Sequence, residues 1–434
     1  MRVRRDGALF ALCLTLQGCI IGGVAVAARS GGSPSTIVAG LALCFVPYAG
    51  VIHFSRSVIS KRVLDRLAIG TALLFGGAFL LAPPLLSDDL YRYLWEGRLW
   101  LEGFNPYRLA PDDPGLAHLR DDLWVHINNK PLATIYPPLS QLIFVAAQWL
   151  GGKVWTLKLL ALAAHVLSVV VVARLSTVPK ASLGLALNPL LLSEAALNGH
   201  FDILCGAALL ITAWALAQHR FLQAGIAACV AVGLKMVGLV VLPLFVRRPK
   251  ALAATGLGSA LLLAPIVWSR APADPVSGAG QFATRWRGNE SLFALFDQLS
   301  RQLWESDSAD LIARSVVAAA LLALCALAVY RRLPPLQATR ALVWALLLLS
   351  PQVHPWYLAW LLPLEVAAAG AAGLVWSAAV LCAYAPLDLW VAQGVWEMPP
   401  SMQIFEYSLV ALALILDPQR PSFRMPRLTG RFPV

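Results

Sequence analysis

Apolar blocks of about 20 residues recur along this chain and constrain its fold more than any other feature. A helix needs about 20 residues to cross roughly 30 Å of hydrocarbon. Of the 434 residues, 59% are hydrophobic and only 13% are charged, with a mean hydropathy of +0.70. A soluble domain cannot bury so much apolar surface. Because the residue alternation of a membrane barrel is absent, the sequence predicts an all-α polytopic membrane protein.

The predicted fold is a bundle of about 12–14 transmembrane helices. The clear candidate spans lie near 7–28, 36–55, 65–86, 153–174, 181–198, 201–218, 250–268, 311–330, 338–351, 356–370, 372–391 and 402–416. Pro137–Leu150 is too short to span and is predicted as an interfacial or re-entrant helix. Phe221–Val246 is long, and Lys235 interrupts it, so we predict two half-length pieces that meet near the lysine. The alternative makes each segment a single span and places Arg174 and Lys180 outside.

Basic residues give the predicted orientation, because short cytoplasmic loops are enriched in lysine and arginine. The net charge of +11 lies mostly in such loops, which argues against a nucleic-acid partner. Both termini are therefore predicted to be cytoplasmic, with the protein spanning a bacterial inner membrane. The segments left on the periplasmic side are 87–135, 198–202, 270–310, 350–357 and 395–401. Acidic, histidine, asparagine and aromatic residues concentrate there, which indicates a functional site on that side.

The first outer loop opens with a helical pattern that carries two aspartates, Asp88 and Asp89. Spacing of i,i+4 predicts the pairs Asp88–Arg92, Arg92–Glu96 and Arg98–Glu102 on a helix at the membrane surface. Capping and the helix dipole together explain one aspartate at this position as well as a functional role does. Adjacent helical residues point about 100° apart, so we expect only one of the two carboxylates to face a cleft.

Polar residues also interrupt apolar sequence at three later points. The stretch 198–202 contains His200 and Asp202 between two spans, where a satisfied polar turn is the simpler interpretation. Lys235 lies within an apolar run and needs a buried partner, for which a phosphate or a loop aspartate is suitable. His354 stands just before Trp356 and Tyr357, and an interfacial aromatic belt explains the two aromatic residues but not the histidine.

With these residues in order, the chain resembles the GT-C superfamily of polyprenol-phosphate-mannose-dependent mannosyltransferases. The nearest patterns are those of the enzyme that adds the first mannose to GPI anchors and of bacterial membrane mannosyltransferases. The motifs that carry the resemblance are Ser87-Asp88-Asp89-Leu90, Gly103-Phe104-Asn105-Pro106-Tyr107, Tyr136-Pro137-Pro138-Leu139, Asn188-Pro189, Gly199-His200-Phe201-Asp202, Lys235, Arg287-Gly288-Asn289 and Trp356-Tyr357-Leu358. Two positions depart from the pattern: Ser87 replaces its first aspartate, and His200 replaces an asparagine.

The resemblance implies that a hexose, mannose by the pattern, moves with inversion from a polyprenyl-phosphate donor to a cell-envelope lipid or glycan. It implies Asp89 or Asp88 as the catalytic base, and Lys235 and Arg287 as ligands of the donor phosphate. Residues predicted to bind sugar or acceptor are Tyr91, Arg92, Tyr136, His200, Asp202, Asn289, His354, Trp356 and Tyr357. No metal ligand is assigned, and a divalent metal is left open because metal use varies across the superfamily.

Three parts follow from the resemblance: 1–60 as two additional N-terminal helices, 61–370 as the catalytic membrane module, and 371–434 as further helices with a basic tail. Alternative functions are a transporter or flippase of lipid-linked saccharides, a related enzyme for another sugar, and a non-catalytic assembly subunit. A transporter predicts internal repeats and polar residues at mid-membrane depth. We find no repeat, and Lys235 is predicted to be the one strong charge inside the spans, which favours an enzyme.

Overall fold

The computed structural model describes residues 2–55, 60–268 and 286–423, and within these ranges the regular elements are all helices. The only bridge between described backbone segments joins Gly288 to Gln352. Six described helical segments are long and apolar enough to cross a membrane: Arg4–Arg29, Pro34–Phe54, Val154–Leu175, Pro249–Ile266, Ser308–Tyr330 and Ala372–Gln393. Several shorter apolar helices pack among them. The predicted all-α polytopic membrane fold is confirmed.

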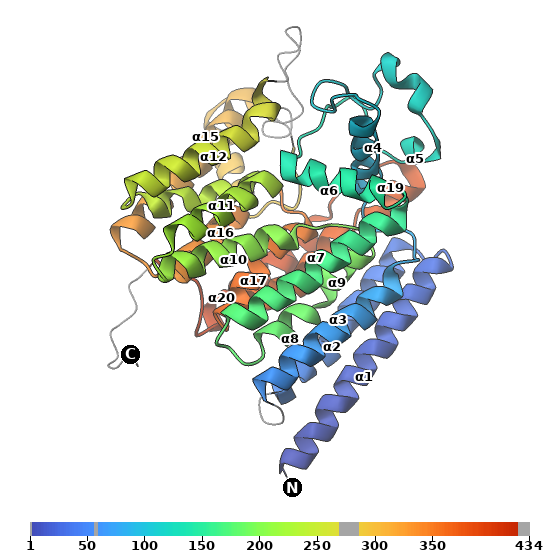
Figure 1. The fold of residues 1–434 in the computed structure, drawn as a ribbon, viewed down its shortest axis with the longest axis vertical. Coiled ribbons are helices and arrows are strands. Elements are labelled where there is room, and N and C mark those ends of the chain that lie inside the picture. Colours follow the sequence, from blue (N-terminus) through green and yellow to red (C-terminus); the bar gives the residue numbers. More distant parts are fainter. Residues whose placement is uncertain (1, 56–59, 269–285, 424–434) are drawn as a thin grey trace.

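The N-terminal helices and the first outer loop occupy one side of the molecule. Helices α1 (Arg2–Arg29), α2 (Pro34–Phe54) and α3 (Lys61–Phe79) run beside one another, and α4 (Asp89–Leu101) begins beyond the upper end of α3 (Figure 1). The loop continues through η2 (Pro114–Leu119) and α5 (Asp122–Val125) to α6 (Pro138–Trp149). Proline at the first position of α6 costs no hydrogen bond, since that backbone nitrogen has no partner inside a helix. The predicted short helix after residue 137 is therefore present.

The central helices are repeatedly interrupted near the outer loops. After α7 (Val154–Leu175), the predicted span at 181–198 is two helices, α8 (Ala181–Ala186) and α9 (Pro189–Ala196), and Asn188 caps the second by accepting from Leu191 N at 3.2 Å. Helix α10 (Ile203–Ala217) follows. Helix α11 (Phe221–Leu234) stops at Lys235, whose backbone is extended, and a 3-10 helix, η3 (Met236–Phe245), continues. The predicted break at Lys235 is confirmed.

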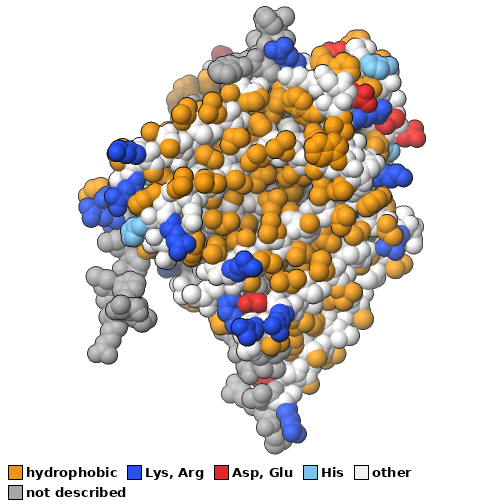
Figure 2. All heavy atoms as spheres, viewed as in Figure 1, with side chains coloured by type: hydrophobic (Ala, Val, Ile, Leu, Met, Phe, Trp, Pro, Cys, Tyr) orange, Lys and Arg blue, Asp and Glu red, His pale blue; other side chains and the backbone are white. Residues whose placement is uncertain are grey.

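The remaining helices complete the bundle. They are α12 (Pro249–Trp268), α14 (Leu292–Leu303), α15 (Ser306–Tyr330), α16 (Pro335–Leu349), η4 (Pro355–Tyr357), α17 (Leu358–Ala367), α18 (Ala372–Ala379), η5 (Val380–Tyr384), α19 (Leu387–Gln393) and α20 (Pro400–Leu416). On the face drawn in Figure 2, hydrophobic side chains cover most of the middle, and acidic side chains gather at the upper right, where Figure 1 places α4 and α5. This division suits a body in lipid with a loop region at the water surface.

Charge inside the predicted spans is more extensive than the sequence indicates, and the expectation that Lys235 is the one strong intramembrane charge is wrong. Lys158 of α7 has no exposed surface, yet its ammonium donates to the carbonyls of Phe79 (2.8 Å) and Ala82 (2.5 Å) at the end of α3. The last carbonyls of a helix lack partners and carry partial negative charge, so they accommodate a lysine. Arg340 and Glu365 form a further buried pair between α16 and α17, with Nε and Oε1 2.5 Å apart.

Glycines allow two close helix contacts that shape the site. At Gly206 of α10, a Cβ atom would lie 2.2 Å from the carbonyl oxygen of Ala359 in α17. At Gly97 of α4, a Cβ atom would lie 2.3 Å from the carbonyl oxygen of Phe144 in α6. Both obstacles are backbone atoms, which cannot rotate away. The helix that begins with Asp89 is therefore held directly against the backbone of α6.

We expect Gly97→Ala to destabilise the protein by about 1–3 kcal/mol, because overpacking forces α4 away from α6. The measurement is the midpoint of thermal unfolding in detergent. Gly70→Ala in α3 is the matched control, since its Cβ would meet nothing within 4 Å. That control should keep or slightly raise the midpoint, as alanine favours helix by up to about 1 kcal/mol over glycine. Equal midpoints for both variants would contradict the contact.

Candidate active site

The two aspartates of the first outer loop converge on a single amide. The Ser87 hydroxyl accepts from Asp89 N at 3.3 Å at the start of α4. The side-chain nitrogen of Asn128 donates to Asp88 Oδ1 at 2.6 Å and to Asp89 Oδ1 at 2.8 Å. Both carboxylates can reach this one amide because Asp88 precedes the helix and is free of its 100° spacing. The expectation that only one of them faces a cleft stays a prediction.

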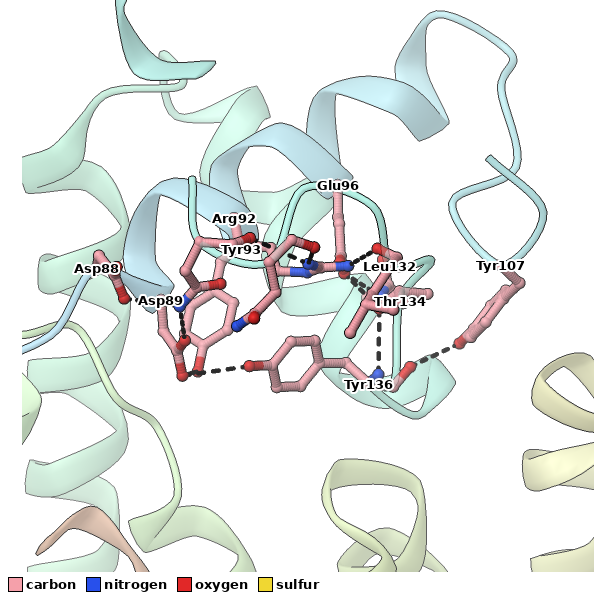
Figure 3. Close-up of polar contacts among 12 residues, drawn as sticks. Asp88, Asp89, Arg92, Tyr93, Glu96, Tyr107, Leu132, Thr134 and Tyr136 are labelled. Carbon is pink, nitrogen blue, oxygen red and sulfur yellow. Dashed lines mark hydrogen bonds and ion pairs between the residues drawn. The ribbon is translucent and has the colours of Figure 1, made fainter. Parts of the chain in front are cut away.

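The second oxygen of Asp89 distinguishes the two carboxylates. Asp89 Oδ2 accepts from the hydroxyls of Tyr93 and Tyr136, each at 3.3 Å, and Figure 3 shows both phenols pointing at it. Burial opposes a charge on Asp89, but His200, the Asn128 amide and Lys235 together lower its pKa below the ordinary 3.8. Burial and the neighbouring Asp89 raise the pKa of Asp88 to about 6. Asp89 is thus held as a carboxylate at the centre of a polar cluster.

Arg92 holds the loop that supplies Asn128 and Tyr136. It is buried, its Nε lies 2.8 Å from Glu96 Oε1, and it donates to the carbonyls of Asn128, Asn129 and Leu132. Glu96 in turn accepts from Thr134 Oγ1 at 2.6 Å (Figure 3). It also accepts from Gln141 Nε2 at 2.7 Å. The predicted Arg92–Glu96 pair is confirmed. These contacts occupy Arg92, so its predicted role in binding substrate has no support here.

Two further predictions for the first outer loop concern Arg98 and Tyr91. The Arg98–Glu102 pair is wrong: Arg98 Nη1 lies 2.8 Å from Asp121 Oδ2, because the loop folds back over α4. The ring of Tyr91 stacks on His126 with centroids 4.8 Å apart. That contact packs the loop, and a substrate-binding role for Tyr91 stays a prediction.

The turn between α9 and α10 and the break at Lys235 form the opposite side of the cluster. Lys235 Nζ lies 3.4 Å from Asp202 Oδ1 and 4.8 Å from the centre of the Tyr136 ring. Asp202 Oδ1 also accepts from Trp360 Nε1 at 2.9 Å. The Lys235 side chain keeps 13% of its surface exposed, whereas Asp202 is fully buried. The partner that the lysine requires is thus Asp202, together with an aromatic face.

An aromatic stack completes the arrangement. Trp356 lies between the rings of His200 and His354, with centroids 4.2 and 4.3 Å away and interplanar angles of 14° and 7°. Tyr357 stacks on Trp360 at 4.2 Å. Burial lowers the pKa of both histidines to about 4, so each imidazole is neutral at pH 7. The structure thus places His200, Asp202, His354, Trp356 and Tyr136 around Asp89 and Lys235. Their roles in binding sugar or acceptor stay predictions.

Arg287 and Asn289 lie in a separate set of contacts. Three carboxylates hold the Arg287 guanidinium: Glu290 at 2.5 Å, Asp297 at 2.9 Å and Asp310 at 3.5 Å. The amide of Asn289 donates to both oxygens of Glu406 in α20. No described contact joins either residue to the Asp89 cluster, and 269–285 of the predicted second outer loop lie outside the described residues. A phosphate-binding Arg287 and a substrate-binding Asn289 stay predictions.

The loop that carries these two residues nevertheless supports the aromatic stack. Gly288 N donates to the carbonyl of Pro351 at 3.1 Å, and Val353 N donates to the carbonyl of Gly288 at 3.0 Å. Gln352 Nε2 then lies 2.6 Å from His354 Nε2. Arg287 therefore fixes a loop whose backbone positions His354.

Sequence reasoning overlooked three residues of this site. Tyr93 follows Asp89 by four positions on α4, so helical spacing alone could have found it. Glu194 is buried next to His200, with Glu194 Oε2 3.7 Å from His200 Nε2, and its place inside an apolar segment was a usable signal. Asn128 lies 39 residues from Asp89 in an irregular loop, and nothing in the sequence marks it. Among the described residues no group of three or more His, Cys, Asp or Glu is placed to hold a metal ion.

The site therefore brings a carboxylate, a partly exposed ammonium group and stacked rings together in a helical membrane bundle. A family model described as "Alpha-(1->6)-mannopyranosyltransferase, N-terminal domain" matches residues 10–249, more than half of the chain. The chain belongs to this family, and it is a multi-pass membrane mannosyltransferase of the type that uses polyprenyl-phosphate mannose. No curated protein and no solved structure matches it. The matched region includes α1 and α2 and extends through Lys235.

We expect the thermal stability of the native protein to report the raised pKa of Asp88. The native carboxyl binds its proton up to about pH 6, while the unfolded one releases it near 3.8. The native state therefore binds more protons between these values, and this contribution to stability is lost as pH rises through that window. Asp88→Asn removes the titration but keeps an oxygen for Asn128. The difference between the unfolding midpoints of Asp88→Asn and the wild type (variant minus wild type) should increase between pH 4 and 6 and stay constant above pH 6. A difference that does not change with pH would contradict the raised pKa of Asp88.

Proposed function

We propose that this mannosyltransferase transfers mannose with inversion onto a hydroxyl of a cell-envelope glycan or glycolipid, at the periplasmic surface, with Asp89 as the base. One observation carries the proposal: Asp89 and Lys235 both lie against Tyr136, the first at its hydroxyl and the second at its ring face. The base, Asp89, and the cation for the leaving phosphate, Lys235, thus contact the same aromatic side chain. That spacing suits a sugar whose C1 lies between them.

The proposed reaction is one displacement. An acceptor oxygen attacks C1 of the mannosyl group, and the bond from C1 to the phosphate oxygen breaks with its electron pair going to the phosphate. Asp89 takes the proton of the attacking hydroxyl. Lys235 neutralises charge that develops on the phosphate, which is most effective in a site with little water. A single displacement inverts the configuration at C1.

Asp89 suits the role of base better than Asp88 on the described contacts. Asp89 alone meets Tyr93 and Tyr136, and it lies on the side of Lys235 and His200. Asp88 faces Asn128 and the charge of Lys130. We assign Asp88 the task of orienting the shared amide. Because carboxylates occupy Arg287, we assign the phosphate to Lys235 and a positioning role to Arg287.

We expect Asp89→Asn to lower kcat for transfer from labelled polyprenyl-phosphate mannose by about 10²–10⁴, the usual contribution of a positioned base. Asp88→Asn should lower it by a smaller factor, because asparagine still accepts from Asn128. Purified protein with a cell-envelope extract as acceptor source provides the assay, and thermal unfolding controls for folding. A larger loss in Asp88→Asn than in Asp89→Asn would transfer the role of base to Asp88.

The outward orientation has its own test. Helix α7 ends at Leu175, and the chain returns through α8 and α9 to the turn at His200. Reporter fusions at Arg174 and at His200 should therefore lie on opposite sides of the membrane, the first cytoplasmic and the second periplasmic. The same side for both fusions would contradict the topology.

A further inference from the structure

A continuous line of polar groups leads from Asp89 into the interior of the bundle. Asp89 Oδ2 lies 3.3 Å from the Tyr93 hydroxyl, and this hydroxyl lies 3.3 Å from His200 Nδ1. Tyr93 and His200 are almost fully buried. Protons move along hydrogen bonds of this kind, so these buried side chains give the proton a defined path.

The inner end of the line is suited to hold one positive charge. His200 Nε2 lies 3.7 Å from Glu194 Oε2, and His200 Nδ1 lies 4.0 Å from Asp202 Oδ2. His200 Nε2 and Asp202 Oδ2 are buried atoms with no hydrogen-bond partner in the described structure. An unpartnered buried polar atom is costly. Protonation of His200 at Nδ1 would add an N–H on the side of Asp202 and would compensate the charge of that carboxylate.

We propose that Tyr93 and His200 form a proton relay that removes the acceptor's proton from Asp89 during each turnover. This inference rests on the proposed role of Asp89 as base. After Asp89 takes the acceptor proton, its O–H passes that proton to the Tyr93 oxygen while the Tyr93 O–H passes its own to His200 Nδ1. No electrons are exchanged and no further reactant is needed. Asp89 is again a carboxylate, and His200 carries the proton until the products leave and the proton returns outward along the same groups.

The charged groups around His200 suit its role as a temporary proton acceptor. Asp89 of α4 and Asp202 at the start of α10 favour the imidazolium. Glu194 of α9 lies on the other side of the ring, 3.7 Å from Nε2. Lys235 at the end of α11 opposes the imidazolium, and His354 lies beyond Trp356. Before reaction the imidazole is neutral, because burial lowers its pKa to about 4. Before the relay begins, Asp89 is therefore ionised and Nδ1 of His200 is free to accept a proton.

Tyr136 also donates to Asp89 Oδ2, but its path does not continue in the same way. The ring of Tyr136 faces Lys235, a cation that opposes the arrival of a proton. Tyr93, by contrast, stacks on Phe144 with centroids 4.6 Å apart, which holds its hydroxyl between the two end groups. Tyr93 and His200 act through Asp89 and need not touch the substrate.

His200→Asn and Tyr93→Phe test the relay. Asparagine places an amide near the former Nδ1 but cannot carry a proton, and phenylalanine keeps the ring packing without the hydroxyl. We expect kcat to fall by about tenfold in each, less than the roughly 10²–10⁴ supplied by a base itself, with KM changed less than twofold. The acidic limb of the pH–rate profile should move to higher pH in His200→Asn, because His200 lowers the pKa of Asp89. The double variant should match the slower single variant.

Matched controls separate the relay from a loss of folding. His165→Asn and Tyr48→Phe alter buried groups outside the line, at Ala186 O and Gly184 O respectively. These two control variants should lower the unfolding midpoint about as much as the test variants do, but they should leave kcat and the pH–rate profile unchanged. An unchanged kcat and pH profile in His200→Asn and Tyr93→Phe, in an enzyme that still depends on Asp89, would overturn the relay alone. Full activity of Asp89→Asn would overturn the proposed base and the relay with it.

Discussion

The buried pair of Arg92 and Glu96 is the interaction on which the rest of the site depends. Arg92 binds the backbone of 128–132, and Glu96 binds Thr134 and Gln141, so one ion pair orders the whole return path of the first outer loop. Asn128 and Tyr136, the two loop residues that contact Asp89, lie within or next to this path. Removing one partner of a buried pair leaves an uncompensated charge, which typically costs about 3–5 kcal/mol. The return path of the first outer loop is therefore ordered by two charged side chains of α4.

Around this loop, the site combines elements from distant parts of the sequence. The helix break at Lys235, the turn at His200 and the segment before α17 each interrupt a helix near the same end of the bundle. Irregular backbone within a membrane protein is stable where it is buried in protein or lines a polar cavity. The interruptions thus place the polar groups of the site without exposing backbone to lipid.

Much of this arrangement follows from sequence patterns alone. Apolar length predicts the helices, and a lysine inside an apolar run predicts the break in α11, because both reflect the cost of polar groups in hydrocarbon. Contacts made by irregular loops do not follow. Asn128 has no local signature, and Arg98 selects Asp121 over Glu102 only after the loop has folded. The burial of Lys158 does not follow from a sequence pattern either, because its partners are backbone carbonyls at and just beyond the end of α3, which any sequence would supply.

The contact at Gly206 has a consequence for how substrates reach the site. Helix α10 begins next to Asp202, and α17 begins next to Trp356 and Tyr357, so their touching backbones join the two walls that hold these side chains. We therefore expect these two helices to keep their relative position, because their backbones already touch. Long lipid-linked molecules would then enter through movements of the loops above them.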